Sequence, residues 1–201
     1  MFVNHMVGMF YHPKEEWGTI HQERYSVLHI FLLQVSVLSL IPAVSMFIGT
    51  TQIGWTLTGS EYIKLEYSSA IPAAIASYFA CWGAVGFIAF AIHWMEKTYG
   101  GNVALNECLI LTTFTATPLF LSGLSALYPM LWFNVSVGLV AVIYSVYLLF
   151  IGVPVIMEIP EDRAFFFSAS ILTVGLCTLV GMLVACVILW DTVVPLNFVT
   201  P

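Results

Sequence analysis

Long, nearly continuous apolar stretches separated by short polar segments dominate the pattern along this chain. Each of the five stretches reaches the roughly 20 residues that an α-helix needs to cross about 30 Å of hydrocarbon. The apolar runs are continuous and do not alternate, so they indicate helices, whose backbone groups are satisfied internally, and not strands of a barrel. The predicted spans are residues 29–53, 69–95, 103–127, 130–151 and 165–190.

The segment ahead of the first span has a different pattern. Val3, Met6, Val7 and Phe10 have helical spacing, and Pro13 suits the first turn of a new helix. We therefore expect an all-α polytopic membrane protein with two parts. An amphipathic membrane-surface segment on the cytoplasmic side covers 1–28, and a five-span transmembrane bundle covers 29–201.

Composition supports the membrane assignment. Hydrophobic residues make up 60% of the 201 positions and charged residues only 8%, whereas soluble domains carry roughly 25% charged residues. The formal net charge is −6 and no run of Lys or Arg occurs. This balance excludes a nucleic-acid partner and a polybasic lipid-binding patch.

Orientation follows from the distribution of Lys and Arg between the two sides of the predicted bundle. With the N-terminus inside, Lys14, Arg24, Lys97 and Arg163 lie on the inner side and Lys64 alone lies outside. Because inner loops carry the excess of basic residues, we expect a cytoplasmic N-terminus. An odd number of spans then places the C-terminus outside.

No catalytic signature is found in the sequence. A Gly-x-Ser-x-Gly elbow, a His-Glu-x-x-His pair, a phosphate loop and a dinucleotide fingerprint are all missing. The two aspartates, Asp162 and Asp191, do not lie deep in a span. The chain is therefore predicted not to be an enzyme, and its cysteines are interpreted as small buried apolar residues. They are Cys81, Cys108, Cys177 and Cys186.

The third span carries hydroxyl residues and a proline. Pro118 is expected to interrupt this helix and to free a carbonyl group that Thr117 or Ser122 could satisfy. Two interpretations are open: the hydroxyls join neighbouring helices, or they line a transport path beside a discontinuous helix. The residues of this polar seam are Thr112, Thr115, Thr117, Pro118 and Ser122.

Histidines and acidic residues gather on the predicted cytoplasmic side. His93 and Glu96 are three residues apart and so share a helix face. Imidazole and carboxylate groups suit zinc-like divalent metals. We therefore consider a cation site in which the N-terminal helix folds against the inner ends of spans two to four; the alternative is a hydrated acidic rim. The candidate ligands are His12, Glu16, His21, His93, Glu96, Glu107 and Glu158.

Glu107 has two interpretations of its own. It lies in the first turn of the third predicted span, where the helix dipole favours a carboxylate. It could also be a proton- or cation-binding group that faces the bundle.

Several strings resemble the Yip (Ypt-interacting protein) family, most closely its compact bacterial branch. They are FIGTTQIGW at 47–55, ATPLFLSGL at 116–124 and ALYP at 126–129. Further matching positions are His12, Pro13, Glu16, Glu23, Tyr147, Leu148, Leu149, Gly152 and Pro154.

The resemblance implies five spans, a cytoplasmic N-terminus and a location in the bacterial inner membrane. Eukaryotic Yip proteins are linked to Rab GTPases, vesicle traffic and association with related membrane proteins, and they carry a longer hydrophilic N-terminal region. Two classes of function are therefore considered. The first is a non-enzymatic protein that acts by association. Its expected partners are membrane lipids, further copies of the chain or another membrane protein. The second is a small oligomeric transporter or channel for an ion or a lipid-like solute.

Overall fold

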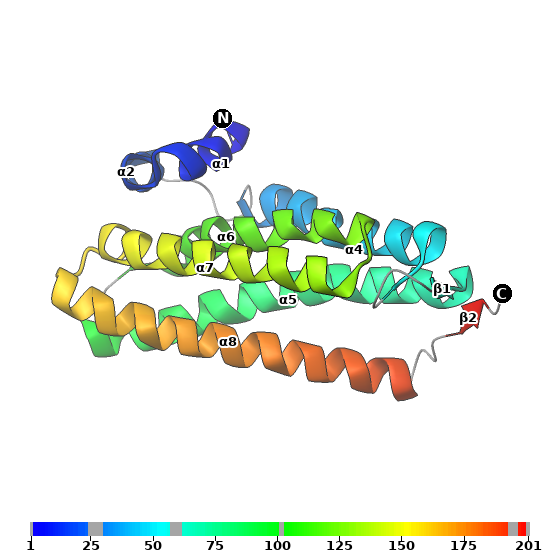
Figure 1. The fold of residues 1–201 in the computed structure, drawn as a ribbon. Coiled ribbons are helices and arrows are strands. Elements are labelled where there is room, and N and C mark those ends of the chain that lie inside the picture. The colour runs from blue at the N-terminus through cyan, green and yellow to red at the C-terminus, as the bar shows by residue number, and fades with distance from the viewer. Residues whose placement is uncertain (1, 24–29, 57–61, 101–102, 193–196, 200–201) are drawn as a thin grey trace.

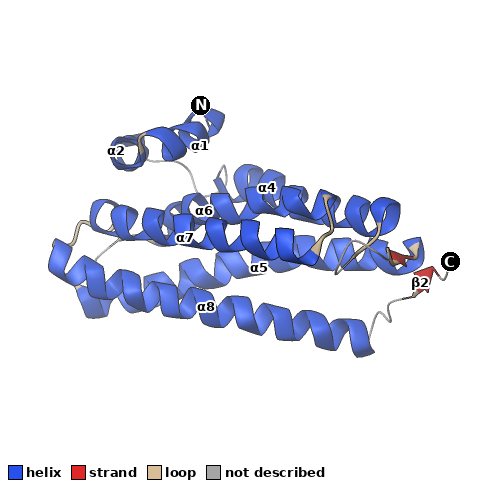
Figure 2. Ribbon diagram, viewed as in Figure 1, coloured by secondary structure: helices blue, strands red, loops and turns tan. Residues whose placement is uncertain are grey.

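The computed structural model is a bundle of long helices with two short strands at one end (Figures 1 and 2). It describes residues 2–23, 30–56, 62–100, 103–192 and 197–199. The α-helices are α1 (Phe2–Tyr11), α2 (Pro13–Glu23), α4 (Ser36–Ile48), α5 (Tyr67–Tyr99), α6 (Leu105–Ser122), α7 (Leu131–Ile156) and α8 (Glu161–Thr192). The shorter elements are the π-helical η1 (Ile30–Val35) and η2 (Gly49–Ile53), the 3₁₀ helix η3 (Gly123–Leu127), and the strands β1 (Lys64–Leu65) and β2 (Phe198–Val199).

Five helical segments are long and apolar enough to cross a membrane, which confirms the predicted all-α polytopic fold. They are Leu33–Ile53, Tyr67–Tyr99, Leu105–Leu127, Leu131–Ile156 and Glu161–Asp191. The second, fourth and fifth extend beyond the predicted 69–95, 130–151 and 165–190. Charged residues occupy terminal turns of the second and the fifth. Hydropathy detects only the apolar centre of such a helix, while its charged ends lie in the interface. The predicted boundary between 1–28 and the first span lies outside the described residues.

Helix α6 is the centre of the bundle. Within the most apolar part of each span, 56% of α6 is buried, against 17% for α5, 33% for α7 and 6% for α8. The larger core cluster gathers buried side chains of α2, α5, α6, α7 and α8, and the smaller one joins Val35, Leu38, Val85 and Phe120. The first, second and fourth spans and the N-terminal helices thus surround α6, and α8 lies at the edge.

The expected interruption of the third span at Pro118 is wrong. Helix α6 continues through Pro118 to Ser122. The hydroxyl of Thr117 donates to the carbonyl of Thr113 at 3.1 Å, and that of Ser122 donates to Leu119 at 2.7 Å. These hydroxyls bond carbonyl groups of their own helix, and neither of these bonds goes to the carbonyl of Phe114, to which Pro118 has no N–H to donate.

The N-terminal segment forms two amphipathic helices, α1 and α2. Chain direction changes at His12, and α2 begins at Pro13 as expected. The two helices lie beside α6 and α7 near the end where α7 turns into α8 (Figure 1). Trp17 and Ile20 of α2 are fully buried, and the hydroxyl of Tyr144 on α7 donates to the carbonyl of Met9 at 2.7 Å. One face of this segment thus contacts protein, while Val7 and Phe10 stay exposed.

Tight connections close the opposite end of the bundle. The side-chain amide of Asn134 donates to the carbonyl groups of Tyr128 and Met130, both at 2.9 Å, and so fixes the short turn between η3 and α7. Strand β2 pairs antiparallel with β1, which ties the C-terminal tail to the connection between the first two spans.

Candidate functional site

The seven candidate metal ligands do not form one cluster. They lie at three places: in the N-terminal helices, at the junction of α2 with the end of α7, and where α5 turns into α6. His12 is exposed at the turn between α1 and α2, next to Tyr147. The single site expected from the sequence is therefore wrong in its extent, because helix rotation and tilt direct these side chains to different faces.

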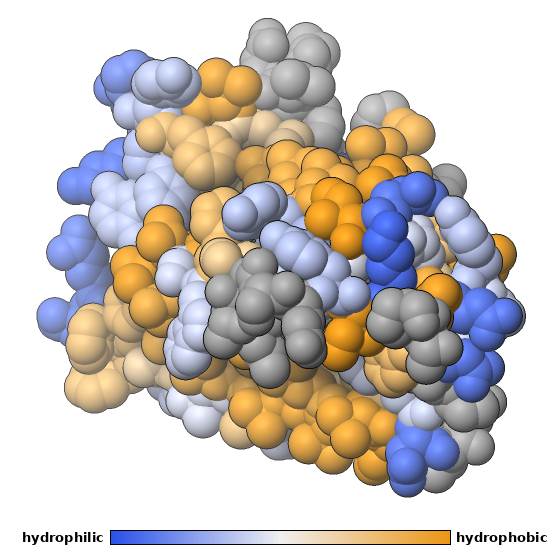
Figure 3. Space-filling view, turned by 45° about the vertical axis from the view of Figure 1, so that its right-hand side comes forward, coloured by the Kyte–Doolittle hydropathy of each residue, from blue (hydrophilic) through white to orange (hydrophobic). Residues whose placement is uncertain are grey.

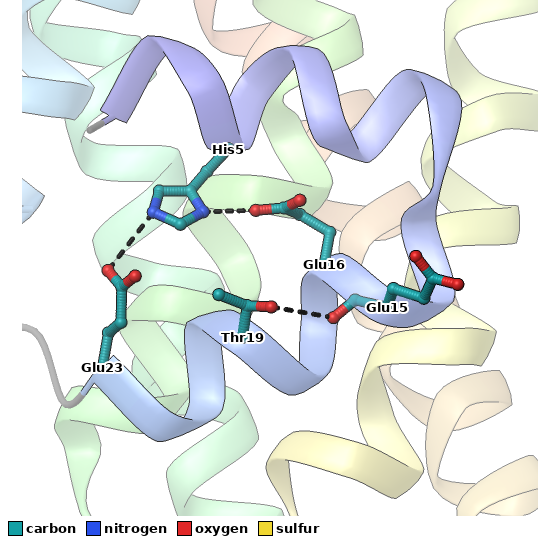
Figure 4. A network of polar contacts seen from close by, with 5 residues as sticks. All are labelled: His5, Glu15, Glu16, Thr19 and Glu23. Carbon is teal, nitrogen blue, oxygen red and sulfur yellow. Dashed lines mark hydrogen bonds and ion pairs between the residues drawn. The ribbon is translucent and has the colours of Figure 1, made fainter.

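Glu16 takes part in a network that holds α1 against α2 (Figure 4). The buried His5 of α1 lies between two carboxylates of α2. Its Nδ1 contacts Glu16, and its Nε2 lies 3.3 Å from Glu23 Oε2. The two ring nitrogens face carboxylates on opposite sides of the ring. The arrangement therefore links α1 to α2, and its ligand atoms do not point at a common position where a metal ion could bind.

The second group is a pair at the surface. His21 Nε2 lies 3.0 Å from Glu158 Oε1, and the Glu158 side chain is 71% exposed. Glu158 has a positive φ of 51°, at the turn that follows α7. An exposed ion pair of this kind adds little stability, so its main effect is to join α2 to the end of α7.

The third group lies at the junction of α5 and α6. Ligand atoms of His93, Glu96 and Cys108 all lie within 4.8 Å of one another. Glu96 is 1% exposed and Cys108 is fully buried, while His93 lies at the edge. Glu96 Oε2 also accepts a hydrogen bond from the backbone N–H of Val103 at 3.2 Å. The pairing of His93 with Glu96 was expected from their spacing, but Cys108 had been interpreted only as a small apolar residue.

Two polar atoms at this junction are buried without a hydrogen bond to any described residue. They are His93 Nδ1 and Glu107 Oε2. His93 Nδ1 lies 3.2 Å from Glu96 Oε1, which is an ion-pair distance without the alignment of a hydrogen bond. Glu107 is in the first turn of α6, as expected. Both Glu96 and Glu107 lie within electrostatic reach of the Cys108 thiol.

The polar seam of α6 bonds mainly to its own helix. The hydroxyl of Thr112 donates to the Cys108 carbonyl at 2.8 Å, and that of Thr115 donates to the Leu111 carbonyl. A hydroxyl that bonds the preceding turn offers little hydrogen bonding to a solute. Each of these bonds stays within α6, so none of them joins α6 to a neighbouring helix, and both interpretations of the seam stay open.

An apolar cavity of about 130 Å³ lies beside this part of α6. Helices α5, α6, α7 and α8 all contribute to its walls. Its hydroxyl groups come from Thr112, Thr115 and Ser145, and the other side chains around it are apolar. A cavity of this chemistry suits a hydrocarbon group.

The sides of the bundle are largely apolar, and hydrophilic residues gather toward its ends (Figure 3). Helix α8 is the most exposed span. Along its outer half, large side chains are exposed on several faces, and an added Cβ at Gly181 would meet no atom within 4 Å. This surface is suited to lipid or to another transmembrane helix.

Fold and comparison together define the class of protein. The family model of the Yip1 domain matches residues 7–182, and the chain belongs to this family of integral membrane proteins. Over 188 residues the chain is 36% identical to the inner membrane protein YohC of Escherichia coli K12, which covers 94% of this chain and 96% of that protein. YohC of the Escherichia coli O6:H1 strain CFT073 shows the same identity and coverage. No solved structure matches the chain.

Proposed function

We propose that this protein is a non-enzymatic inner-membrane protein that acts by association, with α8 as its contact surface for a second copy of the chain. Its N-terminus lies in the cytoplasm and its C-terminus outside, in agreement with the distribution of basic residues. The similarity to YohC, whose name places it in the inner membrane, supports this location.

The observation that carries the proposal is the low burial of α8. Only 6% of its most apolar part is buried inside the chain, whereas the other four spans reach between 17% and 56%. Small residues permit close approach of helix backbones where lipid provides no hydrophobic drive, and Gly181 leaves open space for a neighbour. A two-fold dimer that packs α8 against α8 would bury this surface.

Native mass spectrometry of the untagged protein, released directly from membrane vesicles, tests the proposal. We expect a dimer, and we expect Gly181→Leu to reduce its share strongly. The leucine has space inside its own chain, so it should disturb only packing between chains. Gly138→Leu on α7 is the matched control, because an added Cβ there also meets no atom within 4 Å. A bare monomer in the wild type, or equal dimer shares in both variants, would refute association through α8.

A small transporter of lipid-like solutes is the second candidate, favoured by the apolar cavity among α5, α6, α7 and α8. Its volume is close to the roughly 150 Å³ of an engineered apolar cavity that holds benzene, so it suits part of an acyl chain. Gly175 lines this cavity. If the cavity carries solute, Gly175→Leu should lower the rate at which a fluorescent phospholipid crosses proteoliposome membranes. Rates in wild-type vesicles equal to those in protein-free vesicles would remove this candidate.

A further inference from the structure

The junction of α5 and α6 brings together three different side chains that ligate transition metals. His93 and Glu96 lie in the last two turns of α5, and Cys108 lies in the first turns of α6. Their ligand atoms are within 4.8 Å of one another. Because the residues come from two consecutive helices, their approach depends on how α5 packs against α6 and not on one local motif.

The geometry is close to that of a bound zinc ion. Zinc binds Cys sulfur at about 2.3 Å and His nitrogen or carboxylate oxygen at about 2.0–2.2 Å in a tetrahedral arrangement. Ligand atoms around such an ion are roughly 3.3–3.8 Å apart by simple geometry. The pairs here need to close by no more than about 1.5 Å, which side-chain rotation can supply.

One of the ligands is already fixed in position. The backbone N–H of Val103 donates to Oε2 of Glu96, which leaves Oε1 facing His93. A hydrogen bond to the second oxygen of a ligating carboxylate is typical of the outer shell that orients metal ligands. The site therefore includes a support as well as its ligands.

The buried polar atoms at this junction give a second and independent indication of a cation. Glu96 is almost completely buried, and within the described parts of the chain its ion-pair partner is His93. His93 Nδ1 and Glu107 Oε2 are buried without an aligned hydrogen bond among the same residues. Buried carboxylates are costly unless charge compensates them. A divalent cation would bind His93 and Glu96 and bring positive charge close to Glu107.

We propose that His93, Glu96 and Cys108 bind a zinc ion at the junction of α5 and α6. This proposal does not depend on the association of α8. The imidazole, the carboxylate and the thiolate fill three positions of the tetrahedral ion, and water fills the fourth. Glu107 lies within electrostatic reach of the Cys108 thiol. Binding replaces the thiol proton of Cys108 with the S–Zn bond and releases that proton to water.

The chemical type of the ligands indicates which divalent ion the site would prefer. A thiolate and an imidazole favour zinc, cobalt or copper over magnesium and calcium, which prefer oxygen ligands only. Metal that joins α5 to α6 binds the folded state and not the unfolded chain, so it should also stabilise the bundle.

The test uses untagged protein in detergent, stripped with a chelator and then equilibrated with Zn²⁺ or with Co²⁺. We expect one zinc per chain by elemental analysis after removal of free metal. Bound Co²⁺ should show the near-ultraviolet charge-transfer band of a thiolate ligand. Cys108→Ser should abolish this band and weaken zinc binding at least tenfold, and His93→Gln should weaken it similarly. Cys177→Ser is the matched control, because this exposed thiol lies on α8, and it should bind like the wild type.

Two further readouts keep the result interpretable. Zn²⁺ should raise the unfolding temperature of the wild type and of Cys177→Ser, but not that of Cys108→Ser. Circular dichroism of the stripped variants checks that each remains folded. Zinc well below one per chain in the wild type, cobalt without the thiolate band, or unchanged binding in Cys108→Ser would overturn the proposal. The dimer share in native mass spectra is measured separately, so failure of one proposal leaves the other intact.

Discussion

Attachment of the N-terminal helices depends on a glycine of α7. The fully buried indole of Trp17 lies directly on Gly152. A Cβ added at this glycine would lie 2.6 Å from Cε2 and 2.7 Å from Cζ2 of the indole, and 2.9 Å from Cδ1 of Leu111. The Trp17 ring also packs edge-on against Phe114 of α6, with centroids 6.2 Å apart. Because side chains of α6 contact the indole on its other side, it has little room to move away from a new methyl group. Gly152→Ala should therefore weaken the packing of α2 against the bundle.

The loss of stability that the clash with Trp17 causes can be isolated by comparing Gly152→Ala with Gly138→Ala on the same helix. An added Cβ at Gly138 meets no atom within 4 Å. Both changes remove a glycine from a helix interior, which by itself favours the helix by about 1 kcal/mol. This contribution cancels in the difference between the variants. Overpacking of a well-packed core costs about 1–3 kcal/mol, and we expect Gly152→Ala to be less stable than Gly138→Ala by this amount.

Thermal unfolding in one detergent measures the difference. For a chain of this length, 1 kcal/mol corresponds to roughly 2–4 °C in the unfolding temperature. Limited proteolysis adds a local readout, since undocked N-terminal helices should be cleaved faster in Gly152→Ala only. Equal unfolding temperatures and equal cleavage rates for the two variants would refute the packing of Trp17 on Gly152.

Two further substitutions test other contacts. Gly49→Ala places its Cβ on the backbone carbonyl of Ala126, which cannot rotate away. We expect a loss near 3 kcal/mol, the upper part of the overpacking range, in thermal unfolding, while Gly83→Ala, which has open space, should cost nothing. Replacement of His5 by Gln removes the clamp between α1 and α2 and leaves the Glu16 carboxylate, 18% exposed, without its partner. A bond to a charged group contributes about 1.5–3 kcal/mol, so the N-terminal helices should become more sensitive to protease; an unchanged cleavage rate would show that the clamp is not needed.

The sequence predicts the spans well because their signal is local. Continuous apolar runs of sufficient length indicate a transmembrane helix without any knowledge of its neighbours. The ends are less well predicted, since charged residues such as Glu161 continue a helix into the interface beyond its apolar part. The helix through Pro118 was not predicted either, because a proline alone does not decide whether a helix ends; its surroundings in the folded bundle also matter.

The candidate site is predictable only in part, for a related reason. His93 and Glu96 share a face of one helix, so their spacing predicts their contact. Cys108 belongs to the next helix, and its approach to them depends on the rotation of α6 about its own axis. His12 and Glu16 were grouped with them by charge and predicted side alone. In the structure Glu16 contacts His5 of α1, and His12 is exposed at the turn between α1 and α2.

The contact between Met9 and Tyr144 spans 135 positions of the chain, and this separation has a consequence for biosynthesis. At about 5–20 residues per second, the ribosome needs on the order of ten seconds to make the chain between these two residues. During this time the buried faces of α1 and α2 have no protein partner, and the bilayer surface can shelter their apolar side chains. The N-terminal helices would thus begin as lipid-bound helices and become part of the bundle only after the fourth span has been inserted.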